Sequence, residues 1–197
     1  MKNKLQHKRY IVVGLAASLF LLFAALPALQ SALKNHNFYG HMNRYSVPEI
    51  PGAPVPAGGF NIVFFGFGQC ARVCPAQMVN LIKLQEYVDP DKVHFVYVAL
   101  DADRQDQEQL SNMFKDWGPS FRAVVPDSVS ASQQLAFEYG GFAFERRNRA
   151  PDSERFEHDG RLYVTSEANR VELSYLSTDL EIDRIVDDLS MLSSGRE

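Results

Sequence analysis

An apolar run of strand length, residues 60–67, is the sequence feature that most constrains the fold. A strand with two apolar faces is typical of a parallel sheet that is covered by helices on both sides. Both cysteines of the chain, Cys70 and Cys74, follow this run directly, and Pro75 then occupies a favourable first position for a helix. The sequence therefore predicts a buried strand, a cysteine-bearing loop and a helix in direct succession.

The rest of the chain continues this alternation of strands and helices. The helix after the cysteines is predicted at residues 76–88, and its core-facing side is expected to carry Val79, Ile82 and Tyr87. A second buried strand is predicted at residues 93–100. Further helices are expected at 105–117, 130–139 and 178–192, and further strands at 121–125, 142–147, 161–165 and 170–175. This order predicts an α/β sandwich and fits a thioredoxin-like fold.

Composition and charge are those of an ordinary globular protein. The chain has 197 residues, of which 46% are hydrophobic and 22% are charged, and its formal net charge is −4. This apolar content is sufficient for one hydrophobic core. The mild negative charge provides none of the basic surface that nucleic-acid binding requires, so we expect no nucleic-acid partner.

An uncharged apolar segment near the start of the chain predicts a membrane anchor. Residues 11–29, IVVGLAASLFLLFAALPAL, would span about 28 Å as a helix, close to the hydrocarbon thickness of a bilayer. Positive charges precede the segment at Lys2, Lys4, Lys8 and Arg9, and their excess predicts a cytoplasmic N-terminus. No good Ala-x-Ala site follows the apolar core, which favours a retained anchor over a cleaved signal peptide.

We therefore expect four regions in a single-pass protein of the bacterial inner membrane. These are a cytoplasmic basic leader at residues 1–10, a transmembrane anchor at 11–33, a tether at 34–58 and a soluble periplasmic domain at 59–197. The tether assignment rests on SVPEIPGAPVPAGG, because its proline and glycine content suits an extended linker. The short leader leaves no room for an organellar transit peptide, which favours the bacterial interpretation.

The two cysteines are expected where α/β sheets place their active sites, between the carboxyl end of a central strand and the start of a helix. Unpaired N–H groups and the partial positive charge of the helix end stabilise a thiolate there. A disulfide between Cys70 and Cys74 would close a very short loop and would stabilise the fold little. The spacing is consistent with a structural disulfide, a thiol–disulfide redox pair or two soft metal ligands, and it favours the last two.

The histidines help to separate the metal and redox interpretations. In the predicted domain, His94 falls inside a strand and is interpreted as a packed residue, whereas His158 falls in the polar segment SERFEHDGR. Structural zinc usually requires four protein ligands, which is more than these residues provide. Two thiolates and one imidazole suit copper, because sulfur holds Cu(I) and imidazole helps to hold Cu(II).

Residues 70–75, Cys-Ala-Arg-Val-Cys-Pro, resemble the CPxxCP motif of the Sco/SenC copper chaperones. The segment FEHDGRLYVTSEANRVELSY resembles that family's VDHS segment with the strand and turn after it, and the resemblance covers residues 59–192 and the single N-terminal anchor. It implies a thioredoxin-like fold and one copper ion held by Cys70, Cys74 and His158. It also implies delivery of copper to, or thiol reduction of, the dinuclear copper site in cytochrome c oxidase subunit II or another cuproprotein client.

Several residues depart from the family pattern. The departures in and beside the two motifs are Gly68, Gln69, Ala71, Arg72, Asp159 and Gly160. Arg72 stands where the family usually carries an acidic residue, and its charge is expected to stabilise free thiolates and to oppose a bound copper ion. The segment ALDADRQD corresponds to an acidic loop of the family, in which Asp101 and Arg104 match. The departures favour redox chemistry over storage of Cu(II).

Three hypotheses follow. The first is a membrane-anchored copper chaperone that uses Cys70, Cys74 and His158. The second is a periplasmic thiol–disulfide reductase of thioredoxin-like fold without a physiological metal, in which the two cysteines form the redox pair. The third is a non-catalytic thioredoxin-like interaction module. Copper stoichiometry separates the first from the others, and turnover of a disulfide substrate separates the second from the third.

Overall fold

The computed structural model describes residues 38–146 and 151–195. The leader and the anchor predicted at residues 1–10 and 11–33 lie outside these ranges. Within the described ranges, no helix combines the length and the apolar character that crossing a membrane requires.

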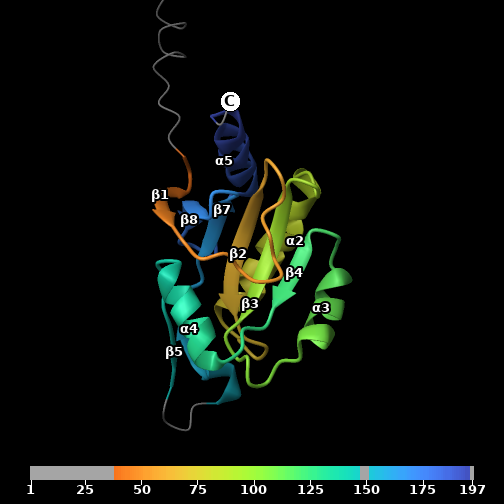
Figure 1. Ribbon diagram of the computed structural model, residues 1–197. Coiled ribbons are helices and arrows are strands. Elements are labelled where there is room, and N and C mark those ends of the chain that lie inside the picture. The colour runs from red at the N-terminus through yellow and green to blue at the C-terminus, as the bar shows by residue number, and fades with distance from the viewer. Residues whose placement is uncertain (1–37, 147–150, 196–197) are drawn as a thin grey trace, which may run out of the picture. The chain divides into compact units, whose positions relative to one another are not determined.

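A six-stranded mixed sheet forms the centre of the fold (Figure 1). From one edge to the other, its strands are β1 (His41–Ser46), β8 (Arg170–Tyr175), β7 (Leu162–Ser166), β2 (Phe60–Gly66), β3 (Val93–Ala99) and β4 (Phe121–Val124). Strands β2, β3 and β4 run parallel, whereas β7 pairs antiparallel with both β2 and β8. The carboxyl ends of β2 and β3 therefore meet at one edge of the sheet, where the cysteine loop begins.

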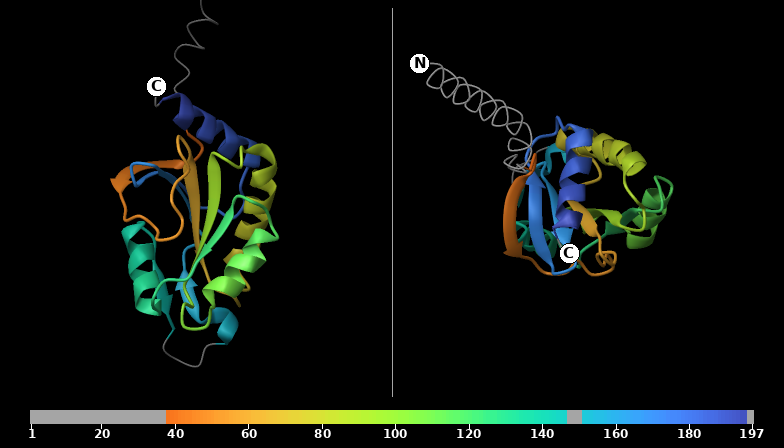
Figure 2. Two further views of the ribbon diagram at one scale, coloured as in Figure 1. Left: turned by 45° about the vertical axis from the view of Figure 1, so that its right-hand side comes forward. Right: turned by 90° about the horizontal axis from the view of Figure 1, so that it is seen from above.

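Helices cover both faces of this sheet (Figure 2). The elements outside the sheet are α2 (Val73–Leu84), η1 (Gln85–Tyr87), α3 (Gln107–Lys115), α4 (Val129–Glu138), β5 (Ala143–Glu145), η2 (Asp152–Glu154), β6 (Phe156–His158) and α5 (Ile182–Ser194). Helices α2, α3 and α5 pack on one face and α4 packs on the other. Strands β5 and β6 form a separate antiparallel pair. The predicted α/β sandwich is confirmed.

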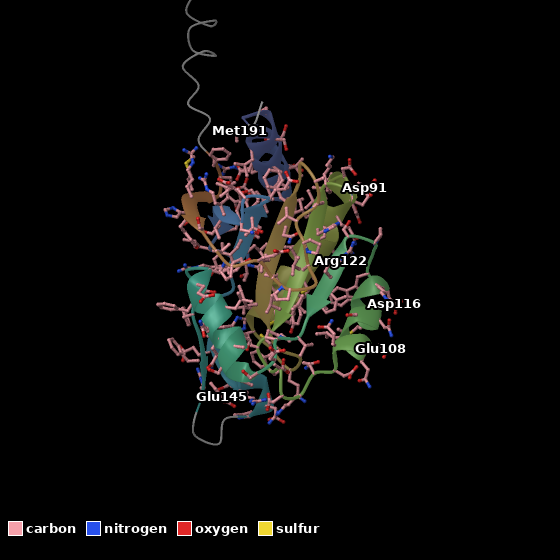
Figure 3. The ribbon with its side chains drawn as sticks, in the orientation of Figure 1. Asp91, Glu108, Asp116, Arg122, Glu145 and Met191 are labelled. Carbon is pink, nitrogen blue, oxygen red and sulfur yellow. The ribbon has the colours of Figure 1, made fainter. Side chains whose placement is uncertain are left out.

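Every residue of β2 is buried, as expected for a central strand with helices on both sides. Phe60, Ile62 and Phe64 face the cluster under α2, α3 and α5. The alternate residues Val63 and Phe65 face the cluster under α4. Most charged side chains lie at the surface, where Figure 3 shows Asp91, Glu108 and Asp116, whereas Asp101 and Asp188 are buried.

The folded unit begins at Phe38, well before the boundary expected at residue 59. Strand β1 pairs antiparallel with β8, and Val47, Ile50 and Ala53 are buried against the α4 side of the sheet. The described part of the segment expected to be a tether is thus packed onto the domain. Composition alone could not show this, because the proline-rich stretch is ordered by the burial of Val47, Ile50 and Ala53 after β1 has paired with β8.

Helix α2 differs from its expected position and orientation. It begins at Val73 rather than residue 76, and Val79, Ile82 and Tyr87, expected in the core, are 49%, 37% and 58% exposed. The side of the helix that is buried carries Cys74, Gln77, Asn80, Leu81 and Leu84. The expectation was wrong because two of these buried residues are amides, which a search for apolar periodicity assigns to solvent.

Candidate metal centre

The cysteine loop connects the carboxyl end of β2 to the first turn of α2. The backbone at its start is tightly packed, because a Cβ atom at Gly66 would lie 2.7 Å from a ring carbon of Tyr97 and 3.3 Å from Cys74 Sγ. The Cys70 N–H donates to the Phe67 carbonyl oxygen at 3.1 Å. Glycine at position 66 thus allows the Cys74 sulfur to lie directly against the end of the strand.

The Cys70 sulfur serves as an acceptor at the helix N-terminus. The residue before α2, Arg72, makes no side-chain hydrogen bond to the first turn. The backbone N–H of Cys74 instead donates to Cys70 Sγ at 3.4 Å. The loop therefore directs a sulfur atom at the positive end of the helix, where a thiolate is favoured.

Cys70, Cys74 and His158 form one compact group of potential metal ligands. His158 Nε2 lies 3.7 Å from Cys70 Sγ and 3.7 Å from Cys74 Sγ. The three donor atoms all lie within 4.8 Å of one another, and both cysteines are free thiols. Cys74 is buried and the other two residues are half-buried, so the group is shielded on one side and accessible on the other.

The orientation of His158 leaves Nε2 available to the sulfurs. Its Nδ1 lies 2.8 Å from the backbone carbonyl oxygen of Asp159, which can only accept, so Nδ1 carries a proton. In the neutral ring the lone pair is then on Nε2, the nitrogen that faces Cys70 and Cys74. The ring also packs edge-on against Phe67 at a centroid distance of 5.7 Å. A metal-binding histidine usually donates a hydrogen bond from its other ring nitrogen to a group such as a backbone carbonyl, as Nδ1 does here.

Gln77 attaches the segment after His158 to α2. It is fully buried, and its amide donates to the carbonyl oxygens of Gly160 and, at 3.0 Å, Ser177. Asn80 donates to Gln77 Oε1 at 2.9 Å and so fixes the direction of that amide. The sequence reasoning missed this role. The sequence does contain a signal for it, since Gln77 and Asn80 place two amide side chains three residues apart on the helix that follows the cysteines.

The electrostatics of the site make the two thiols unequal. A hydrogen bond from the Cys74 thiol is the main cause that lowers the pKa of Cys70 from 9.0 to about 3, and hydrogen bonds from the backbone add to it against the effect of burial. The same hydrogen bond, together with burial and the neighbouring thiolate, raises the pKa of Cys74 well above its ordinary value. Cys70 is therefore the thiol that ionises first, and Cys74 is the one that keeps its proton.

The other residues that the sequence singled out have different surroundings. The Arg72 side chain is exposed, and its contribution to the low pKa of Cys70 comes from its backbone amide. His94 lies in β3 and is half-buried, which confirms its interpretation as a packed strand residue. Asp101 is buried after β3 and accepts a hydrogen bond from the Gly68 N–H at 3.1 Å, which places it beside the cysteine loop.

A groove of about 520 Å³ leads to the thiols from the side of α3. Cys70, Cys74, Pro75, Met78, Tyr97, Leu110, Phe114 and Trp117 are among the residues that line it. The groove is largely apolar near the sulfurs, so it admits another molecule to Cys70 while limiting contact with water.

The spacing of the donor atoms fits a first-row metal ion. Bonds of about 2.3 Å to sulfur and about 2.0 Å to an imidazole nitrogen, meeting at a trigonal angle, separate the donors by about 3.7 Å. This agrees with the two Sγ–Nε2 distances of 3.7 Å. Two soft sulfurs and one imidazole are a donor set that copper accepts in both of its common oxidation states.

Fold and site together define a thioredoxin-like protein with a candidate Cys–Cys–His metal centre. The family model described as SCO1/SenC matches residues 53–194, so the chain belongs to the SCO1/SenC family. The chain is 27% identical over 67 residues to "Protein SCO1 homolog, mitochondrial" from Homo sapiens. That match covers 32% of this chain and only 22% of the human protein.

Solved structures share the fold. The apo Sco1 protein from Thermus thermophilus is 28% identical with a TM-score of 0.63, and the match covers 81% of this chain and 99% of that one. Copper-bound ScoI from Arabidopsis thaliana is 19% identical with a TM-score of 0.58, over 71% of this chain and 86% of that one. The expected thioredoxin-like fold is therefore confirmed.

Proposed function

We propose that this protein is a copper chaperone that holds one copper ion as cargo with Cys70, Cys74 and His158. The observation that carries the proposal is the convergence of two sulfurs and one imidazole nitrogen from separate parts of the chain, with both Sγ–Nε2 distances at 3.7 Å. Membership of the SCO1/SenC family and the existence of a copper-bound relative support copper over other soft metals.

The properties of the two thiols suit a carrier that accepts and releases its cargo. Cys70 is ionised at neutral pH and half-exposed, so it can take up copper first. Cys74 must lose its proton when it becomes a ligand, so uptake releases that proton. The groove beside Cys70 gives a client's ligands access to the same sulfur, which ligand exchange requires.

The client and location belong to the same proposal. We assign delivery to the dinuclear copper site of cytochrome c oxidase subunit II, or to another cuproprotein, on the basis of the family resemblance. Residues 11–33 are proposed to anchor the chain in a bacterial inner membrane, with residues 1–10 in the cytoplasm and the folded unit in the periplasm. The uncharged apolar run and the preceding lysines support this topology.

Thiol–disulfide reduction is the second candidate, because the low pKa of Cys70 also suits a nucleophile. The Cys70 thiolate would attack a client disulfide, form a mixed disulfide and expel a client thiolate, which takes up a proton. Cys74 would then lose its proton and attack Cys70 Sγ, releasing the second client thiol. Two electrons pass to the client, and the protein is left with a Cys70–Cys74 disulfide.

Parallel copper titrations of the wild-type chain and His158→Ala test the chaperone proposal. Two thiolates can hold Cu(I), whereas Cu(II) prefers nitrogen donors, so the variant should lose at least tenfold in Cu(II) affinity and less than threefold in Cu(I) affinity. Disulfide reduction should be little changed. Equal Cu(II) affinity in the two proteins would remove His158 from the site and leave the reductase as the better account.

A further inference from the structure

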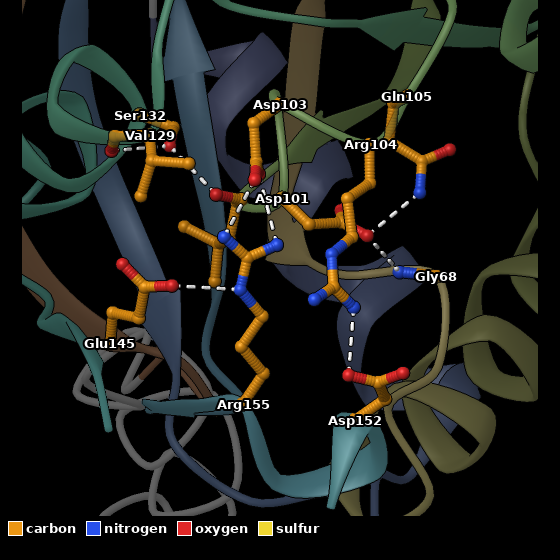
Figure 4. A network of polar contacts seen from close by, with 11 residues as sticks. Gly68, Asp101, Asp103, Arg104, Gln105, Val129, Ser132, Glu145, Asp152 and Arg155 are labelled. Atoms are coloured by element: carbon orange, nitrogen blue, oxygen red, sulfur yellow. Dashed lines mark hydrogen bonds and ion pairs between the residues drawn. The ribbon is translucent and has the colours of Figure 1, made fainter. Parts of the chain in front are cut away.

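The loop between β3 and α3 contacts both chain segments that carry the candidate ligands (Figure 4). At its start, Asp101 Oδ2 accepts hydrogen bonds from the Gly68 N–H at 3.1 Å and from Gln105 Nε2 at 2.7 Å. Gly68 belongs to the loop that carries the cysteines. Asp103, two residues further along, is directed at the segment that carries His158. One short loop thus connects two ligand-bearing segments that are far apart in the sequence.

The contact to the His158 segment is made by Arg155. Its Nη1 and Nη2 donate to the two oxygens of Asp103 at 2.9 and 2.8 Å, and its Nε donates to Glu145 Oε1 at 2.8 Å. Its guanidinium carbon also lies 5.0 Å from the ring centre of Phe156. Arg155 immediately precedes β6, the three-residue strand that ends at His158. The fork of this arginine therefore joins the β3–α3 loop, β5 and β6 at one point.

This ion pair differs from its neighbours in geometry and burial. The Arg155 side chain is only 13% exposed, and it binds the carboxylate of Asp103, which is 47% exposed, with two parallel hydrogen bonds. Arg104 also crosses to the same segment, where it contacts Asp152 at 2.8 Å, but these side chains are 47% and 56% exposed. Exposed single contacts of this kind stabilise little, whereas a bidentate pair on a largely buried arginine fixes an orientation. Arg155 also lowers the pKa of the Asp103 carboxyl, which keeps the pair charged in mildly acidic solution.

The strand that ends at His158 needs such a restraint. Among the described residues, this three-residue strand pairs only with the three-residue β5, and so short a pair has little stability of its own. The cysteines, in contrast, are held by β2 and α2 in the centre of the fold. If β6 shifts, the imidazole moves relative to the sulfurs while the sulfurs stay in place.

We propose that the Asp103–Arg155 pair is a positioning device that holds His158 over the two thiols and thereby stabilises the three-ligand site. The inference rests on the proposed copper function. It assigns no contact with the metal to either residue. Both act through the backbone of β6, and they set the preference for a sulfur–nitrogen site over a site made by the two sulfurs alone.

The test compares Arg155→Met with Arg155→Lys in the full-length chain. Methionine keeps much of the apolar volume and removes the guanidinium, whereas lysine keeps the charge without the bidentate fork. Arg155→Met should lower Cu(II) affinity by about tenfold to a hundredfold, as for other residues that orient metal ligands, and Cu(I) affinity by less than threefold. Arg155→Lys should bind Cu(II) more tightly than Arg155→Met but more weakly than the wild-type chain. Asp103→Asn should lower Cu(II) affinity in the same direction, and it tests the pair if Arg155→Met fails to fold.

A double-mutant cycle shows whether the effect passes through His158. In a His158→Ala background, Arg155→Met should change Cu(II) affinity by less than twofold, because the ligand that it positions is already absent. Arg170→Met is the matched control, since Arg170 forms an ion pair with Glu172 on β8 outside this network. It should leave both affinities unchanged. Equal losses for Cu(I) and Cu(II), or full additivity with His158→Ala, would overturn the proposal.

A metal-free measurement separates this inference from the proposed function. In the apo chain, Arg155→Met should speed hydrogen exchange at the amides of β6 by at least tenfold and leave β2 protected. Unchanged or uniformly faster exchange would overturn the positioning role, whatever the copper titrations show. If His158→Ala itself does not weaken Cu(II) binding, the three-ligand proposal fails, while exchange still decides whether the pair restrains β6.

Discussion

The reactivity of Cys70 should be nearly independent of pH between 5 and 8. An ordinary thiol with a pKa of 9.0 is ionised to about one part in ten at pH 8 and about one part in ten thousand at pH 5, so its alkylation slows about a thousandfold. With its pKa lowered to about 3, Cys70 stays about 99% ionised at pH 5. The predicted change in rate over this range is therefore about one per cent.

The assay is iodoacetamide alkylation of the reduced full-length chain, with the modified cysteine identified by mass spectrometry. Cys70 should react alone, because Cys74 is buried and its pKa is raised. Cys74→Ala removes the hydrogen bond that is the largest cause of the low pKa, so its Cys70 should react clearly more slowly at pH 5 than at pH 8. A wild-type rate that falls a hundredfold or more between pH 8 and pH 5 would refute the reasoning.

The same shift links folding stability to pH. The folded-state pKa of Cys70 lies below its ordinary value of 9.0, so the unfolded chain binds more protons between about pH 3 and pH 9. The contribution of Cys70 is fully present above pH 9 and is lost as the pH falls toward 3. The raised pKa of Cys74 opposes this effect only at alkaline pH, where the unfolded chain releases that proton first.

Three substitutions test the packing and electrostatics around the site. Gln77→Ala removes two buried hydrogen bonds to backbone carbonyls and should lower the free energy of unfolding by about 2–4 kcal/mol in denaturant titrations, and a loss below 1 kcal/mol would contradict that role. Gly66→Ala places a Cβ 2.7 Å from Tyr97 and should cost about 1–3 kcal/mol in the same assay, so wild-type stability would contradict the close packing. Arg72→Asp should change Cys70 alkylation at pH 7 by less than about threefold, because its exposed charge is screened by solvent, whereas a tenfold slowing would show direct tuning.

The strands and helices around the site were predictable because a buried strand appears in the sequence as an apolar run, and proline and glycine residues mark the helix ends. Strands β2 and β3 appear as apolar runs, since both of their faces are covered. Strand β1 was missed, because HMNRYS is an edge strand with largely exposed side chains and no apolar alternation. Its order comes from pairing with β8, a contact between residues more than a hundred positions apart in the sequence.

The candidate ligands were easier to predict than the residues that hold them. Two cysteines beside a predicted helix start are visible in the sequence, and the family resemblance added His158. No local pattern connects Arg155 to Asp103, or Gln77 to Gly160, because each contact forms only when the chain folds. Apolar periodicity also misplaced the buried face of α2, where amides with hydrogen-bond partners replace apolar side chains.

X-ray absorption at the copper edge of the loaded full-length chain tests the central claim most directly. We predict two sulfur neighbours at about 2.3 Å and one imidazole nitrogen at about 2.0 Å, with the nitrogen signal lost in His158→Ala. A shell of nitrogen and oxygen neighbours without sulfur, or a nitrogen signal that persists in His158→Ala, would contradict a copper site made by Cys70, Cys74 and His158.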